Sequence, residues 1–153
     1  MNTILPFWKT KTLEEMSILE WESLCDGCGL CCLHKIEDED SGIIYETGVA
    51  CRLLDKETCR CKDYVHRKSV VQNCIVLDIT MVKEACWLPK TCAYRLIYEG
   101  KDLQWWHPLV SGSIQTVHEA QSSACKKIEI YEDELLSESD YVNYLTGPLY
   151  EGQ

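Results

Sequence analysis

The residues with the clearest chemistry in this chain are four cysteines within one eight-residue stretch, CDGCGLCC. Two thiolates separated by two residues can bind one tetrahedral zinc or one iron of a cluster, because a tight turn directs both sulfurs inward. Gly27 and Gly29 suit such a turn, since glycine permits positive φ and lets backbone N–H groups face the sulfurs. The spacing therefore predicts metal ligands at Cys25, Cys28, Cys31 and Cys32.

Further thiols follow along the chain, among them a Cys-x-Cys pair that fits an irregular loop better than an ordinary zinc turn. Cys92 begins a predicted helix, whose positive dipole end favours a thiolate. The candidate ligands downstream are Cys51, Cys59, Cys61, Cys74 and Cys92. Cys86 and Cys125 lack ligand spacing and are interpreted as small buried hydrophobes. His34 and His66 are close to cysteines in sequence, but solvent-facing or structural roles are favoured for both.

The chain has 11 cysteines in 153 residues, and the compartment decides what so many thiols do. We expect no signal peptide, because Met1–Trp8 lacks a basic start followed by an apolar run. No stretch approaches the roughly 18 consecutive apolar residues of a membrane helix. We therefore expect a reducing, cytoplasmic location, where metal or redox chemistry is the commoner use of clustered cysteines.

The net charge of −10 is unevenly distributed along the chain. Seven acidic residues and no Lys or Arg lie in 128–153, which leaves the first 127 residues at only −3. Nucleic-acid phosphates require a basic face, so nucleic acid is not an expected partner, and neither is a membrane. The acidic C-terminal segment 128–153 is interpreted as a solvated end.

Several short elements are predicted to position the cysteines. Thr12 with Glu15 and Ser17 with Glu20 form capping boxes, and the second begins a helix that leads into Cys25. A helix is predicted over 91–99, capped by Thr91 and ended by Gly100, and another from Thr80 to about Cys86. Two short stretches, 43–47 and 127–131, resemble strands. The predicted fold class is mainly α with irregular loops, with a small α+β fold as the alternative.

We predict a single compact domain over 1–153, organised around a cysteine-thiolate metal centre. The metal-binding core would be 25–92, which has few long apolar stripes and so buries little apolar area per residue. Metal bonds can replace a missing hydrophobic core, because the free energy of metal binding becomes free energy of folding.

The same residues resemble a known family. CDGCGLCC is similar to the CxxCxxCC signature of bacterial zinc- or iron-chelating proteins, and the match is closer to the YcgN-like branch. Similar stretches cover almost the whole chain, including 20–35, 49–55, 58–64, 87–96 and 99–103. The resemblance implies metal ligands at all nine candidate cysteines and leaves Cys86 and Cys125 outside the pattern. It implies no particular reaction.

Three functions remain open at this point. The first is a metal-binding module that holds zinc or iron in a structural or regulatory role. The second is an iron–sulfur protein that carries electrons or senses redox state. The third is an enzyme of unknown substrate, which is less favoured because no phosphate loop, His-Glu-x-x-His or Gly-x-Ser-x-Gly motif is present. Zinc and iron–sulfur clusters both accept four thiolates, and the fourth cysteine is too close for a ferredoxin run.

Overall fold

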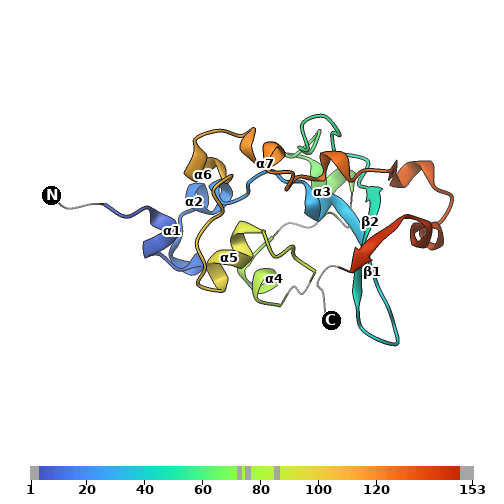
Figure 1. Ribbon diagram of the computed structural model, residues 1–153, viewed down its shortest axis with the longest axis horizontal. Coiled ribbons are helices and arrows are strands. Elements are labelled where there is room, and N and C mark those ends of the chain that lie inside the picture. The colour runs from blue at the N-terminus through green and yellow to red at the C-terminus, as the bar shows by residue number, and fades with distance from the viewer. Residues whose placement is uncertain (1–3, 72–73, 75–76, 85–86, 149–153) are drawn as a thin grey trace. The chain divides into compact units, whose positions relative to one another are not determined.

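The computed structural model describes residues 4–71, 74, 77–84 and 87–148, and it divides into two compact units. Unit 1 comprises Met1–Asp26 and Leu77–Ala120, and unit 2 comprises Gly27–Val76 and Gln121–Gln153. Each unit is built from two segments that are far apart in the sequence. Figure 1 labels the main helices and strands along the chain. The single domain expected over 1–153 stays a prediction.

Unit 1 is built from short helices joined by turns. Both capping boxes predicted from the sequence are confirmed, each at the start of its own helix: Thr12 pairs with Glu15 before Leu13–Glu15, and the Ser17 hydroxyl accepts from the Glu20 N–H at 3.1 Å before Ile18–Ser23. The helices of unit 1 are α1 (Phe7–Thr10), η1 (Leu13–Glu15), α2 (Ile18–Ser23), α4 (Ile79–Glu84), α5 (Ala93–Tyr98), α6 (Pro108–Ser111) and α7 (Thr116–Glu119).

Two predicted helix starts are wrong by a few residues. α5 begins after Cys92 rather than Thr91, and Gly100 at φ +76° closes it as predicted. For α4, the Asp78 carboxylate accepts from the Met81 N–H at 2.8 Å, so Asp78 and not Thr80 caps the helix. Asp is as good a cap as Thr, and the sequence pattern alone did not separate them. The predicted end of this helix, Cys86, lies outside the described residues.

The core of unit 1 is made of leucines and aromatic rings. Its buried members are Leu13, Leu24, Val82, Leu88, Ala93, Tyr94 and Leu103. The side chain of Tyr94 stacks on Trp21 at 4.6 Å and donates its hydroxyl to the Trp21 carbonyl at 2.7 Å. His107, only 2% exposed, accepts at Nδ1 from the Leu109 N–H, so its Nε2–H donates to the Leu24 carbonyl at 2.7 Å.

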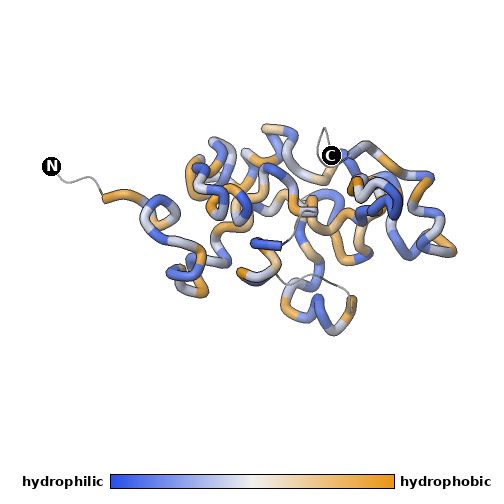
Figure 2. The backbone as a smooth tube through the Cα atoms, turned by 90° about the horizontal axis from the view of Figure 1, so that it is seen from below, coloured by the Kyte–Doolittle hydropathy of each residue, from blue (hydrophilic) through white to orange (hydrophobic). Residues whose placement is uncertain are grey.

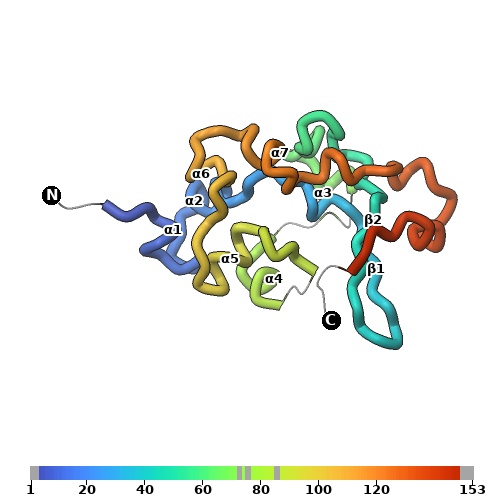
Figure 3. Tube along the Cα trace, in the orientation of Figure 1, coloured from blue at the N-terminus to red at the C-terminus, as the bar shows by residue number. Residues whose placement is uncertain are grey.

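Unit 2 is organised by a small mixed sheet. The strands are β1 (Leu33–Glu37), β2 (Ile44–Ala50), β3 (Ile130–Tyr131) and β4 (Leu145–Pro148). β2 is the central strand: it pairs antiparallel with β1 and β4 and parallel with β3. The β1–β2 hairpin is visible as neighbouring tubes in Figure 3. Short helical turns complete the unit: η2 (Leu30–Cys32), α3 (Arg67–Val70), η3 (Ala124–Lys126), η4 (Glu132–Glu134) and η5 (Glu138–Tyr144).

The sheet makes the prediction of a mainly α fold wrong, and the chain has an α+β fold with a small four-stranded sheet. The two strand-like stretches found in the sequence lie at β2 and β3. β1 and β4 were missed because β1 carries His34, Lys35 and Glu37 and β4 carries Gly147 and Pro148, so neither shows apolar alternation.

Unit 2 has a core in which leucines and alanines pack with cysteine sulfur. Its buried cluster is Leu30, Leu33, Ala50, Leu54, Cys59 and Ala124, against which Cys28, Cys32 and Cys125 pack. Figure 2 shows short hydrophobic stretches interrupted by polar ones along the tube. Among the helices in the described residues, none is long and apolar enough to cross a membrane.

Candidate metal centre

The CxxCxxCC loop begins at two glycines with left-handed backbone. Gly27 has φ +75° and Gly29 has φ +73°, which confirms the positive φ expected of this turn. A Cβ at Gly27 would lie 2.9 Å from the Arg60 guanidinium, and one at Gly29 would lie 3.0 Å from the Cys59 carbonyl oxygen. Neither glycine can therefore be replaced without strain. The turn passes into η2, which carries Cys31 and Cys32, and then directly into β1.

Backbone hydrogen bonds bring the next cysteine to this loop. β2 ends at Ala50, and the Cys51 N–H donates to the Cys32 carbonyl at 2.8 Å. On the other side of the loop, the Ala124 N–H donates to the Cys28 carbonyl at 2.7 Å. Cys51 and Ala124, which are 73 positions apart in the sequence, therefore frame the motif from both sides.

The Cys-x-Cys segment forms a tight turn beside the loop. Asp55 organises it: its carboxylate accepts from the Glu57 and Thr58 N–H groups at 2.8 and 3.2 Å. Cys61 then forms an isolated bridge with Leu54. Cys59, with φ +59° and 2% exposure, is joined to Cys125 by a disulfide. A disulfide sulfur is not a thiolate, so Cys59 can be a metal ligand only in the reduced protein.

The thiols of unit 2 are close enough to raise one another's pKa values. The pKa of Cys32 is raised far above its usual range, first by its hydrogen bond with Cys31, then by burial and by the charges of Cys31, Cys51 and Cys74. Burial raises the pKa of Cys51 to about 11. The pKa of Cys74 is also raised, first by burial, with Cys61 and Cys31 adding to it against the charges of Arg67 and Lys68.

Closely spaced thiols of this kind are suited to binding a cation. Several thiols that each resist ionisation because the others would also be charged become thiolates together when a metal ion supplies positive charge between them. Within the described part of unit 2, no three ligand atoms lie within 4.8 Å of one another. Metal binding would therefore have to draw these neighbouring sulfurs inward to the separation of about 4 Å that a tetrahedral site needs.

A carboxylate that the sequence analysis assigned to a solvated run lies beside these thiols. Glu132 is 15% exposed, and its Oε2 accepts from the Arg52 N–H at 2.9 Å and lies 3.5 Å from His34 Nε2. It also makes a side-chain hydrogen bond with Cys51. No local signal could have found Glu132, because its partners are some 80 to 100 residues away in the sequence.

Two predicted ligands belong to the other unit. Cys25 is exposed at the end of the segment Met1–Asp26, and Cys92 is half-buried against the core of unit 1. Their participation in a shared site stays a prediction. His66, the second histidine near the cysteines, is exposed and pairs with Asp63 at 3.0 Å.

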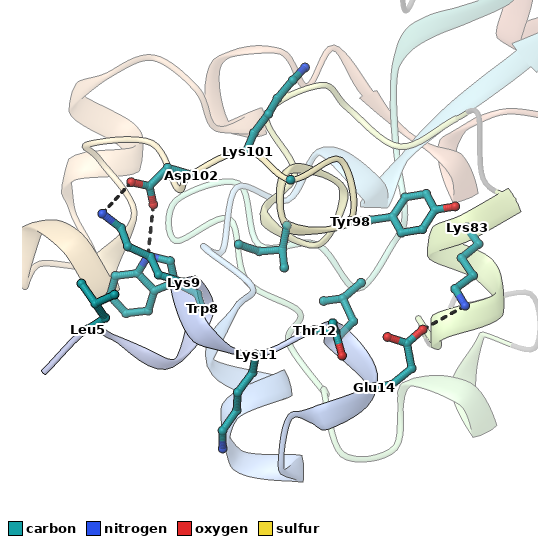
Figure 4. Close-up of a pocket in the computed structure, with 13 residues that line it drawn as sticks. Leu5, Trp8, Lys9, Lys11, Thr12, Glu14, Lys83, Tyr98, Lys101 and Asp102 are labelled. Carbon is teal, nitrogen blue, oxygen red and sulfur yellow. Dashed lines mark hydrogen bonds and ion pairs between the residues drawn. The ribbon is translucent and has the colours of Figure 1, made fainter.

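A pocket of about 870 Å³ in unit 1 offers a different chemistry (Figure 4). Its charged groups are paired: within the lining Lys9 pairs with Asp102 at 3.1 Å and Lys83 with Glu14 at 2.9 Å, while Lys11 and Lys101 pair with Glu20 and Glu99 outside it. Trp8 also donates from its indole nitrogen to Asp102 at 3.2 Å. Cysteine and histidine are both absent from its described lining residues, so this pocket is not a candidate for a thiolate metal centre.

Comparison with known proteins places the cysteine segment in a recognised context. Residues 24–93 match the family model CxxCxxCC, described as "Putative zinc- or iron-chelating domain". A UPF0260 protein of Brucella melitensis is 54% identical over 143 residues, which cover 94% of each chain. A UPF0260 protein of Mesorhizobium japonicum is 58% identical over 140 residues, which cover 92% of this chain and 95% of that one. No solved structure shows a significant match.

Proposed function

The chain belongs to the UPF0260 family and carries its CxxCxxCC domain, and we propose that it holds zinc or iron through clustered cysteine thiolates in a structural or regulatory role. One observation carries the proposal: five thiols of unit 2 lie close enough to affect one another's ionisation. The pKa of Cys32 is raised by Cys31, Cys51 and Cys74, and Cys61 contributes to raising the pKa of Cys74. Cys28 is the sixth thiol of this group through the CxxC spacing that precedes Cys31.

The proposed ligands extend beyond this group to those that the family resemblance implied. They are Cys25, Cys28, Cys31, Cys32, Cys51, Cys59, Cys61, Cys74 and Cys92. Thiolates suit both zinc and iron, and a bound metal would lower the raised thiol pKa values that now oppose ionisation. Metal uptake should therefore release protons and weaken as the pH falls. A cytoplasmic location fits this chemistry, because a reducing compartment keeps Cys59 and the other ligands as thiols.

The experiment is anaerobic purification of the full chain followed by metal analysis and visible absorption. A colourless protein with stoichiometric zinc supports a zinc centre. A brown protein with charge-transfer bands, iron and acid-labile sulfide supports an iron–sulfur cluster. A protein that retains neither metal, and takes up neither when reduced and reconstituted, would contradict the proposal.

The second candidate function is an iron–sulfur protein with a redox role. The half-buried position of several thiols favours it, since burial and hydrogen bonding to sulfur are the means by which a protein sets a cluster's reduction potential. Reversible bleaching of the visible bands on reduction, with a measurable potential, would support this candidate. Absence of acid-labile sulfide in the loaded protein would exclude it.

A further inference from the structure

One cation of unit 2 is placed against the CxxCxxCC loop from within the sheet. Lys35 lies on β1, three residues after the last cysteine of the motif, and its side chain is half-buried. Its Nζ donates to the Leu30 carbonyl at 2.9 Å and to the Leu33 carbonyl at 3.0 Å. These two carbonyls flank Cys31 and Cys32, so the ammonium lies inside the turn that carries both thiols.

The charges around this ammonium come mainly from the motif. Burial lowers the pKa of Lys35, and the charges of Cys31, Glu46, Cys28 and Cys32 act in the opposite direction. Glu46 is the residue paired with Lys35 across the β1–β2 ladder. Three of these four acidic groups, Cys28, Cys31 and Cys32, are proposed metal ligands.

We propose that Lys35 is the positioning residue and resident counter-ion of the thiolate centre. Its ammonium would offset the negative charge of the Cys28, Cys31 and Cys32 thiolates, and its two hydrogen bonds would hold η2 in the conformation that presents them. This inference rests on the proposed metal-binding function and extends it to the charge of the loaded site.

Elementary electrostatics explains why such a residue is needed. Four thiolates on one Zn²⁺ leave a net charge of −2, and a partly buried charge is unfavourable unless it is paired. Outer groups that hydrogen-bond or compensate ligands contribute to metal affinity nearly as strongly as some ligands do. Lysine also remains a point charge that can lie near several sulfurs at once.

Other cations near the thiols do not share this position. Lys68 donates to the Cys74 carbonyl at 3.0 Å, but its side chain is exposed, so solvent screens its charge. The Arg60 side chain lies beside Gly27 and is exposed as well. Arg67, whose charge acts on Cys74, is half-buried too, but its guanidinium donates to the Tyr64 carbonyl at 2.6 Å. Lys35 differs because it is anchored twice to the loop that carries the thiols.

The test separates the charge of Lys35 from its hydrogen bonds. Lys35→Gln keeps an N–H donor and removes the charge, Lys35→Arg keeps the charge, and Lys35→Met removes both. Zinc affinity of the reduced full chain is measured at fixed pH by competition with a colorimetric chelator. Lys56→Gln, which removes an exposed lysine of the same unit, is the matched control.

We expect Lys35→Gln and Lys35→Met to lower zinc affinity by about tenfold or more, the usual range for outer residues of metal sites. Lys35→Arg and Lys56→Gln should bind as the native protein does. If Lys35→Gln binds zinc normally and only Lys35→Met is impaired, Lys35 acts only through its hydrogen bonds to the loop, and the counter-ion assignment is wrong.

A second measurement separates the loss of charge from a loss of folding. Thermal unfolding of the metal-free, reduced variants should show that Lys35→Gln melts close to the native protein, so that its lost affinity reflects charge. If Lys35→Gln lowered the melting temperature of the metal-free protein as well as its zinc affinity, the lost affinity would reflect a damaged fold, and the proposal would be overturned. A native chain that binds neither zinc nor iron would contradict the proposed function itself, whereas normal binding by Lys35→Gln would contradict only this inference.

Discussion

The cores of the two units of this protein are built from different side chains. Unit 1 buries leucines, a valine and Tyr94, and further rings such as Trp21 pack against them. Unit 2 buries three leucines, two alanines and Cys59 in one cluster, with the thiols Cys28 and Cys32 at its edge, and it also buries Ile44, Val49 and Val71. Alanine and cysteine remove less apolar area from water than leucine or tryptophan. From this difference at the cluster we expect unit 2 to depend on metal bonds in addition to apolar burial.

Polar groups reinforce the same contrast. In unit 1 both ring nitrogens of the buried His107 bond to the backbone, at Leu109 and Leu24, although the buried indole nitrogen of Trp106 has no hydrogen-bond partner among the described residues. In unit 2 the polar groups at the centre are thiols whose pKa values are raised by burial and by one another. Such a group is stable when neutral and gains most from a cation. Unit 1 is therefore expected to be self-sufficient, and unit 2 to depend on metal.

Removal of metal should have the largest effect on the difference in stability between the two units. Structural zinc contributes roughly 10–16 kcal/mol of apparent binding free energy in zinc-finger peptides, which is more than a small core supplies. We expect chelation under reducing conditions to abolish hydrogen-exchange protection in unit 2, including most of the proposed core 25–92. Protection in α5 of unit 1 should persist. An unchanged exchange pattern after complete stripping would show that metal is not structural.

The second prediction separates ligands from other cysteines. Cys28→Ser removes a proposed ligand and should lower bound metal substantially and destabilise unit 2, because a hydroxyl is a poor replacement for a thiolate on zinc or iron. Cys125→Ser removes the disulfide partner of Cys59 and should leave metal content unchanged in the reduced protein. Elemental analysis of both variants, purified identically, decides the matter. Equal metal loss in the two would mean that Cys125 is itself a ligand.

The turn that carries the candidate ligands could be predicted from sequence because its signal is local. Two glycines and four cysteines within eight positions specify a turn, and Gly27 and Gly29 adopt the expected positive φ. The capping boxes at Thr12 and Ser17 were found for the same reason. Glu132 and the Cys59–Cys125 pairing were not, since each depends on contacts between segments 66 or more residues apart. Two of the four strands, β1 and β4, were missed because they are short and show no apolar alternation.

A core substitution in unit 1 tests the other side of the comparison. Leu88 is 1% exposed, and Leu88→Ala should destabilise unit 1 by about 2–5 kcal/mol through lost burial and the cavity that remains. Metal content per folded protein should not change. Chemical denaturation followed by tryptophan fluorescence measures the loss, because Trp21 packs against the same core. Loss of metal in this variant would show that the units are not energetically separate.

The smallest expected effect comes from one hydroxyl group. Tyr94→Phe keeps the ring that stacks on Trp21 at 4.6 Å and removes only the hydrogen bond to the Trp21 carbonyl. A net loss of about 1 kcal/mol is expected, slightly more if the buried carbonyl finds no new donor. Because the bond joins α5 to α2, the change should appear as faster exchange in both helices and nowhere in unit 2. If Tyr94→Phe instead altered zinc affinity, unit 1 would contribute directly to the metal centre, and the proposed ligands Cys25 and Cys92 would be the first positions to examine.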